Sequence, residues 1–496
     1  MELLQPKYKD LAQGNGAGIP ILKAIWDKFD LSLLLSKSGI MKYSGVQSWI
    51  IVFAYIVGLI ANKKSVLGIS EYASNDKLLQ PIFRNLKIAQ CNFSRFFTSK
   101  YDWRLFGLKR VERLQQDRET ALSEGDVIVL DDTKVAHPFG KKIPFLCWLF
   151  DSSSKIDIYC MNLVATIAVL NNGLKLPLFW RIWRKEDNID NRQSKIELSK
   201  QMLLDIRKVC KHKLWVAMDR WFLCKNLFVW LVQNNFDWVT KAKRNTSLFR
   251  KEIEPVTGRD RFIPVKPSML IKEVFFNLIK DGENKELKAV SLPNIYIKLP
   301  QKIITKRGRK SPKNIFTPIA AIAAIRLRED MEQTEDEFDC VKDDIATYRN
   351  AYLLISNRVD APEEALDAYI KRWSIEVFFR TAKQELGLNC CHSLNENHHY
   401  AHIELLFTAE TLLAFARWQL INEGVEEDFT HGQMVRSFFN AAYSIVLKAN
   451  RTLKTIQVYF ATDVRRFASL INKFWPVNIV LGWFSTSNNH LLELNA

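Results

Sequence analysis

The sequence predicts an α/β protein: a mixed-sheet core, a β-rich insertion within that core, and helical regions at both ends. Three observations predict this fold. Helical periodicity fills residues 1–121, short β-branched runs begin at Asp126, and prolines punctuate a β-like stretch within 246–345. A chain of 496 residues can bury a large core and form several domains. We expect boundaries near residues 121, 245, 345 and 425, with the core continuing after the insertion over 346–425.

Composition predicts a folded protein with a polyanionic partner. Apolar residues make up 48%, and 14 Trp and 31 Phe argue against disorder. The net charge of +17 favours nucleic acid, and a membrane surface or a ribosome contact is the alternative. Eight cysteines without a CxxC pair, together with a start that is no secretory signal, predict a reduced, cytoplasmic protein.

The N-terminal region reads as a helical domain. Its apolar clusters cover Ile19–Leu35, Val46–Ile60, Leu78–Leu86 and Phe93–Leu108. Segments Ser65–Ala73 and Asn92–Lys100 form either a DNA-binding helix-turn-helix, with Asn92 or Ser94 as the second helix cap, or a bundle that serves only packing. The 17 uncharged residues Gly45–Ala61 fall short of the roughly 20 that a membrane span needs. We therefore expect a buried core or dimer helix there and no membrane association.

Two strands of the predicted core end in acids. Asp126–Leu130 reads as a buried strand that runs into Asp131, Asp132 and Thr133. Carboxylates at the end of a central strand can hold a cation at the rim of a sheet, although Asp and Thr also suit a turn or a helix cap. Leu214–Met218 reads as a second buried strand, ending in Asp219.

The elements around these acids complete a recognisable order. Tyr159–Leu178, with Asn172-Gly173 in its middle, predicts a β-hairpin, and Lys195–Cys210 predicts a helix. The order strand, hairpin, helix, strand is that of an RNase H-like nuclease core. A further strand, Asp237–Lys241, leads into a basic cluster that suggests phosphate contacts or merely protects a sheet edge. The cations in question are Lys241, Lys243 and Arg244.

Residues 246–345 differ from the core and are expected to form the insertion. Lys302–Lys313 concentrates positive charge around one Gly and one Pro, and predicts a mobile loop that follows a DNA backbone. The alternative is a solvated loop without a role. The cations that we expect to contact DNA are Lys306, Arg307, Arg309 and Lys310.

A helix over 369–383 gathers one acid among cations. At about 100° per residue its polar side chains fall within an arc of roughly 80°. They are Tyr369, Arg372, Glu376, Arg380 and Lys383. Such a face suits a site that holds a metal ion together with a nucleic-acid backbone, whereas an exposed i,i+4 Arg–Glu pair is the simpler explanation. We expect Pro362 to begin this helix.

The spacing Tyr-(2)-Arg-(3)-Glu-(6)-Lys on this helix resembles the motif of DDE transposases in the group named after insertion sequence 4. The resemblance extends over about 126–420. It implies that Asp132, Asp219 and Glu376 form a catalytic triad holding two Mg²⁺ ions, or Mn²⁺, for DNA cleavage and strand transfer. It also implies a homodimer on double-stranded DNA, both transposon ends and target, with phosphates gripped by Tyr369, Arg372, Arg380 and Lys383.

Relatives in this group also form DNA hairpins, which need an aromatic platform for an extruded base. The insertion has no Trp between Trp238 and Trp373, so Tyr296, Tyr348 or Phe316 would have to substitute. A catalytically silent, transposase-derived DNA-binding protein and a related nuclease such as a resolvase are the alternatives. Cysteines and histidines over 390–402 lack a zinc-binding frame, and residues 426–496 are expected to be helical and to serve dimerisation.

Overall fold

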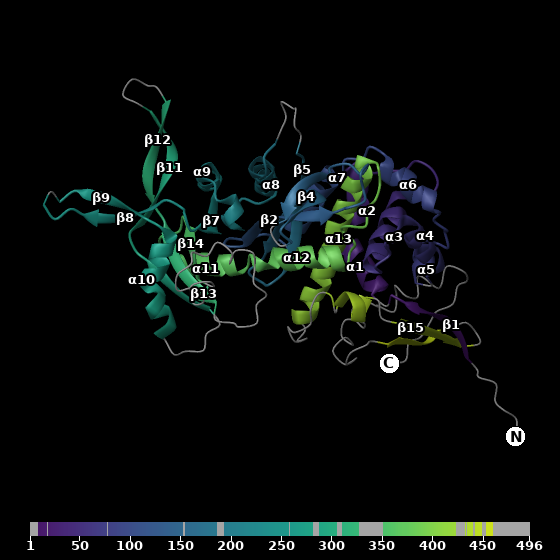
Figure 1. Cartoon of the computed structure of the whole chain (residues 1–496). Coiled ribbons are helices and arrows are strands. Elements are labelled where there is room, and N and C mark those ends of the chain that lie inside the picture. The colour runs from purple at the N-terminus through teal and green to yellow at the C-terminus, as the bar shows by residue number, and fades with distance from the viewer. Residues whose placement is uncertain are drawn as a thin grey trace.

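The computed structural model describes residues 8–422, except 17, 77, 152–153, 186–192, 257, 281–286, 305–309 and 327–350, and also describes 432, 434–439, 442–448 and 453–459. Figure 1 shows a central sheet with helices on both sides. The N-terminal helices lie at one end of this sheet and the strands of the insertion at the other.

The core sheet has the strand order of an RNase H-like fold. Its five central strands follow the order β5-β4-β2-β6-β7. The pairs β2–β4 and β4–β5 are antiparallel, whereas β6 is parallel to both β2 and β7. A short strand, β3, continues along the β5 edge of β4. Strand bounds are β2 Val127–Ala136, β3 Cys147–Asp151, β4 Ile156–Val169, β5 Lys175–Trp183, β6 Leu214–Met218 and β7 Phe236–Lys241. The predicted strands and hairpin are confirmed.

The insertion contributes to two sheets. Strands β8, β9, β11 and β12 form a separate four-stranded sheet, whereas β10 and β13 extend the core sheet beyond β14. The bounds are β8 Leu248–Ile253, β9 Asp260–Val265, α10 Pro267–Lys280, β10 Leu287–Leu292, β11 Ile295–Ile304, β12 Lys310–Pro318, β13 Ala320–Arg326 and β14 Ala351–Ser356. The β-rich character predicted for this stretch is therefore present.

Helices cover opposite faces of the core sheet. On β5, Arg181 binds Asp205 of α8, whereas its neighbour Trp180 donates to Glu404 of α13. Because adjacent strand residues point to opposite faces, α8 and α13 lie on opposite sides. The helices of the catalytic half are α8 Lys195–Val209, a 3₁₀ turn at Arg220–Phe222, α9 Lys225–Gln233, α11 Pro362–Ile370, α12 Trp373–Gln384 and α13 Glu396–Asn422.

The helix predicted from Pro362 through Glu376 is two helices. α11 ends at Ile370 and α12 begins at Trp373. At the joint the chain tightens: the Arg372 N–H bonds the Tyr369 carbonyl at 2.9 Å, and the Ile375 N–H bonds the Arg372 carbonyl at 3.2 Å. These i,i−3 bonds replace the i,i−4 pattern, as in a 3₁₀ turn. Periodicity alone did not reveal the joint, because Lys371 and Arg372, the two residues between the helices, keep helical dihedrals.

The N-terminal helices pack around α3, which is buried along nearly all its length. No helix within the described residues is long and apolar enough to cross a membrane. Helices α4 and α6 are not a helix-turn-helix, since α5 separates them in the chain. The N-cap of α6 is Ala89, not the expected Asn92 or Ser94. The bounds are α1 Ile19–Lys28, α2 Leu31–Lys37, α3 Ser48–Ile60, α4 Val66–Asn75, α5 Leu79–Ile82, α6 Gln90–Thr98 and α7 Trp103–Gln115.

Both ends of the described chain meet in a small sheet that the sequence did not predict. β1, Tyr8–Asn15, pairs with β15, Ala442–Lys448, which pairs with β16, Leu453–Tyr459. The expectation of helix over 426–496 is therefore wrong for these two C-terminal strands, and only Met434–Phe439, a π-helical turn, is helical over several described residues there. The sequence signal for them is their content of β-branched residues, namely Ile445, Val446, Thr455, Ile456 and Val458.

Candidate functional site

Asp131 and Asp132 lie on β2 next to the point where the parallel strand β6 ends. The sequence predicted that the strand ends at Leu130, before Asp131 and Asp132. In the structure β2 continues to Ala136, so both acids lie within the strand. β6 stops at Met218, which is level with Leu130. Asp131 is therefore level with Asp219, and both are in extended backbone. Since side chains alternate along a strand, Asp131 and Asp132 point to opposite faces.

Asp131 faces α12 and shares a guanidinium with Glu376. Arg372 Nη1 donates to Asp131 Oδ2 at 3.3 Å, and Nη2 donates to Glu376 Oε1 at 2.5 Å. All three side chains are partly buried, with exposed fractions of 16% for Arg372, 17% for Asp131 and 30% for Glu376. One cation thus bridges an acid of the central strand and an acid of the helix.

Asp219 adds a third negative charge to this group. It follows β6 and accepts a bond from the Trp221 N–H at 3.3 Å. Burial raises the pKa of Asp131 well above its usual value, Arg372 opposes this, and Asp219 and Asp132 raise it further. Burial also raises the pKa of Glu376, with Arg372 lowering it and Asp219 raising it. We call Asp131, Asp219, Glu376 and Arg372 the acid group.

Asp132, which the motif selected, lies on the other face. Its Oδ2 accepts from Asn162 Nδ2 and from Lys195 Nζ, each at 2.7 Å. The Lys195 ammonium lies 4.8 Å from the centre of the Trp221 ring, next to the segment that carries Asp219. Asp132 is therefore near the acid group but neutralised by a lysine of its own, and the structure brings Asp131, not Asp132, to Arg372.

An aromatic path links the acid group to β7. The Tyr369 ring lies 6.0 Å from the Tyr352 ring, and the Lys241 ammonium lies 5.1 Å from the centre of Tyr352. Arg372 lies 5.6 Å from the Tyr369 ring. Tyr352 and Tyr369 thus lie between Lys241 and Arg372, while Lys243 and Arg244 follow β7 in the adjoining loop.

The two remaining cations of the predicted helix face differ in setting. Arg380 is exposed, and its charge lowers the pKa of Glu376. Lys383 is half-buried, and burial lowers its pKa; Asp151 opposes this and Lys134 adds to it. Lys383 therefore lies toward the end of β2, farther along the sheet than Glu376.

The insertion places only part of its predicted DNA-binding set. Lys306, Arg307 and Arg309 lie outside the described residues, and Lys310 begins β12. β11 and β12 pair as far as Ile304 and Lys310, so the predicted loop over 302–313 is largely a β-hairpin. The sequence did not predict these strands because the segment is rich in Lys and Arg, which are typical of a solvated loop.

Aromatic residues form a cluster on the four-stranded sheet. Phe316 stacks on Phe262 at 4.0 Å between ring centres, and Tyr296 lies 5.1 Å from Phe262. The Lys298 ammonium lies 4.8 Å from the Phe316 ring. Two of the three aromatic candidates from the sequence therefore share one surface, and Tyr348 lies outside the described residues.

No group of three or more His, Cys, Asp or Glu side chains in the described part of the chain is arranged to hold a metal ion. Around residue 390 the reason is visible, because His402 is fully engaged: Nδ1 bonds the Tyr55 hydroxyl at 2.9 Å and Nε2 bonds the Gly387 carbonyl at 3.0 Å. In the acid group Arg372 stands between two of the carboxylates.

Sequence reasoning missed three partners of the site. Asn162, Lys195 and Tyr352 lie on β4, α8 and β14, and each looked like an ordinary member of its element. Only Asn162 gave a signal, since it is an amide within the apolar run Cys160–Ala165 of β4; in the structure it is fully buried and bonded to Asp132.

Comparison with known proteins identifies the domain that contains these residues. The sequence model of the family described as transposase DDE domain matches residues 123–412. A solved piggyBac transposase synaptic complex with hairpin DNA is similar over 86% of this chain and 81% of that chain, at 8% sequence identity and a TM-score of 0.41. No curated protein sequence matches the chain.

Proposed function

The chain belongs to the transposase DDE domain family, and from this premise we propose that it is a DNA transposase that cleaves and joins strands at transposon ends. We place it in the insertion sequence 4 group, because Tyr369, Arg372, Glu376 and Lys383 keep that group's spacing. The observation that carries the proposal is the acid group: three acids from β2, the end of β6 and α12 gather around one guanidinium.

We propose Asp131, Asp219 and Glu376 as the catalytic acids, in place of the Asp132 that the motif selected. The support is the register of β2 and β6, which sets Asp131 level with Asp219 and turns it toward α12. Asp132 is the competing candidate, since it is adjacent in sequence and its partner Lys195 lies against Trp221.

The chemistry of the acid group suits Mg²⁺ or Mn²⁺. All three donors are carboxylates, which hard divalent cations prefer. Burial raises the pKa of Asp131 and Glu376, and the charge of Asp219 raises both further. Bound Mg²⁺ would activate the attacking water or DNA 3′-hydroxyl and would stabilise the departing oxygen of the phosphodiester. Arg372 now neutralises Asp131 and Glu376; with a cation present, its guanidinium becomes available to a DNA phosphate.

The DNA path follows from the cations around the acid group. We propose that Lys241, Lys243, Arg244, Arg380 and Lys383 contact DNA beside the acid group, and that Lys306, Arg307, Arg309 and Lys310 extend the contact along the insertion hairpin. Phosphate contacts position DNA without reading its sequence. Replacing Lys306 and Arg309 by Gln should flatten the salt dependence of binding by about 0.9 per lost contact, with little change in sequence preference. The aromatic cluster with Tyr296 and Phe316 is a candidate platform for the base extruded in a hairpin step.

The test is nicking of a supercoiled plasmid that carries the DNA flanking the gene, with and without Mg²⁺. Wild type should nick only with the metal, and Glu376→Gln and Asp219→Asn should lose at least about 10³-fold in rate while still binding the DNA. Asp157→Asn, an exposed acid on β4, is the matched control and should nick normally. Wild type that binds DNA but never nicks it would favour the silent, transposase-derived binding protein.

A further inference from the structure

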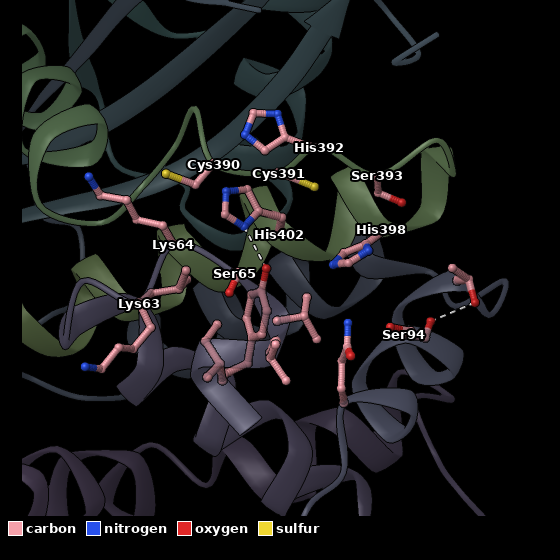
Figure 2. Close-up of a pocket in the computed structure, with 17 residues that line it drawn as sticks. Lys63, Lys64, Ser65, Ser94, Cys390, Cys391, His392, Ser393, His398 and His402 are labelled. Atoms are coloured by element: carbon pink, nitrogen blue, oxygen red, sulfur yellow. Dashed lines mark hydrogen bonds between the residues drawn. The ribbon is translucent and has the colours of Figure 1, made fainter. Parts of the chain in front are cut away.

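A hollow lies between the N-terminal helices and the segment that follows α12. We call it the α4 pocket; it has a volume of about 360 Å³. Lys63, Lys64 and Ser65 line it at the start of α4, Ser94 contributes from α6, and His398 from the start of α13. Figure 2 shows these side chains around one hollow, with the His398 ring on the side opposite Lys63 and Lys64.

The charge of the α4 pocket is positive. None of its 17 lining residues is Asp or Glu, and two of them are lysines. The start of α4 adds to this field, since the first turn of a helix presents N–H groups without intrahelical partners. The Ser65 hydroxyl already accepts the Gly68 N–H at 3.0 Å, which fixes the turn. A pocket with this charge and these donors suits a phosphate group.

His398 points to a ligand independently of the helix end. Its side chain lines the pocket and only 7% of the residue is exposed, yet Nε2 has no hydrogen-bond partner among the described residues. A buried polar atom without a partner costs about 1–3 kcal/mol, so such atoms need an explanation. Burial, and to a lesser extent the charge of His399, lower the pKa of His398 to about 4, so at neutral pH the ring is uncharged. An uncharged imidazole can donate one N–H to a phosphate oxygen.

We infer that the α4 pocket binds a backbone phosphate of the DNA, with Lys63, Lys64 and the start of α4 supplying positive charge and His398 a hydrogen bond. The inference rests on the proposed function for its choice of DNA as the source of the phosphate. The pocket joins α4 and α6 to the segment that leads from α12 into α13, so a phosphate held there ties the N-terminal helices and the catalytic helix to one duplex.

The test measures binding of the full-length chain to a 30-base-pair duplex in EDTA, so that cleavage plays no part. Lys63→Gln with Lys64→Gln should lower the slope of log affinity against log salt by about 1 to 2 and weaken binding about tenfold or more near 0.1 M salt. Lys208→Gln with Lys211→Gln removes the same charge from two exposed lysines at the end of α8 and should leave the slope unchanged.

His398 provides a second, uncharged arm. His398→Leu should weaken binding about fivefold without changing the slope, while His398→Gln, which keeps an N–H donor, should retain most of the affinity. Equal unfolding temperatures would show that neither variant acts through the fold. Inorganic phosphate distinguishes the source: if it raises the unfolding temperature of wild type but not of the double-lysine variant while all DNA slopes are equal, the pocket is a small-anion site and the inference is overturned.

The inference and the proposed function fail differently. An unchanged slope for Lys63→Gln with Lys64→Gln, in a chain that binds DNA and nicks it, overturns the inference alone. The expected slope change in a chain that nicks nothing supports the pocket and removes the proposed catalysis. A wild type that does not bind DNA overturns both.

Discussion

Two Arg–Glu pairs lie on the same side of the core sheet, and they differ in how completely they are satisfied. Arg110 of α7 and Glu404 of α13 are almost fully buried, with side-chain exposures of 1% and 3%. Arg110 donates to Glu404, to the Thr411 hydroxyl, and to the carbonyls of Pro177 and Leu178. Arg372 and Glu376 are more exposed, and Arg372 is shared with Asp131.

The direction of the pKa shift does not separate the two pairs. Burial raises the pKa of Glu404 as it does that of Glu376. The balance of charge does separate them: the charges of Arg110 and Arg181 both lower the pKa of Glu404, whereas the charges of Asp131, Glu376 and Asp219 all raise the pKa of Arg372. Excess positive charge around one carboxylate makes a closed structural pair. Excess negative charge around one guanidinium leaves room for a further cation, and this difference identifies the functional pair.

The largest expected effect separates the two adjacent acids of β2. Asp131→Asn should reduce Mg²⁺-dependent nicking at least about 10³-fold, because it removes an acid of the proposed metal site. Asp132→Asn should reduce it less than about tenfold, since this acid is already neutralised by Lys195. Initial rates of plasmid nicking measure both. The reverse order would return the catalytic role to Asp132 and break the comparison on which the acid group is based.

Removing each arginine should sharpen the contrast in stability. Arg110→Met should cost about 3–5 kcal/mol in the free energy of unfolding, because it strands a buried carboxylate. Arg372→Met should cost about 1 kcal/mol, since Glu376 and Asp131 remain partly solvated. Urea unfolding at pH 7 measures both variants. Equal costs would mean that the Arg372 pair is as structural as the Arg110 pair.

The buried Arg110–Glu404 pair leaves no space for a side chain at Gly107 of α7. A Cβ added at Gly107 would lie 2.7 Å from Glu404 Oε2, so Gly107→Ala should destabilise by about 2 kcal/mol even though alanine favours helices. Gly68→Ala is the control: its Cβ would meet nothing nearer than the Ser65 hydroxyl at 3.3 Å, and its effect should stay within about 0.5 kcal/mol. Thermal unfolding of both variants checks this, and a neutral Gly107→Ala would show that Glu404 has room to move.

The smallest effect is one of pH. The pKa of Asp131 is higher in the folded state than its usual value of 3.8, so the folded state binds the proton more tightly and stability falls as pH rises from about 4. Asp131→Asn removes this dependence and should be more stable than wild type at pH 7, by about 1 kcal/mol. The two proteins should converge near pH 3.5. A pH-independent difference in urea midpoints would contradict the assignment.

Local patterns predicted the core strands and the hairpin, because each short β-branched run is bounded by turn residues. They did not decide between Asp131 and Asp132. That choice depends on where β6 ends beside β2, which is a property of two segments more than 80 residues apart. The pairing of Arg110 with Glu404 could not be predicted for the same reason, since it joins α7 to α13.

The length of β6 has a consequence for how this domain can vary. Its five residues, Leu214–Met218, set both the height and the facing of Asp219. Adding or deleting one residue would rotate that carboxylate to the opposite surface and move it by one rise along the sheet. Inserting or deleting one residue here should therefore be as damaging as losing Asp219 itself. Inserting or deleting two residues would keep the carboxylate on the same face and change only its position along the sheet.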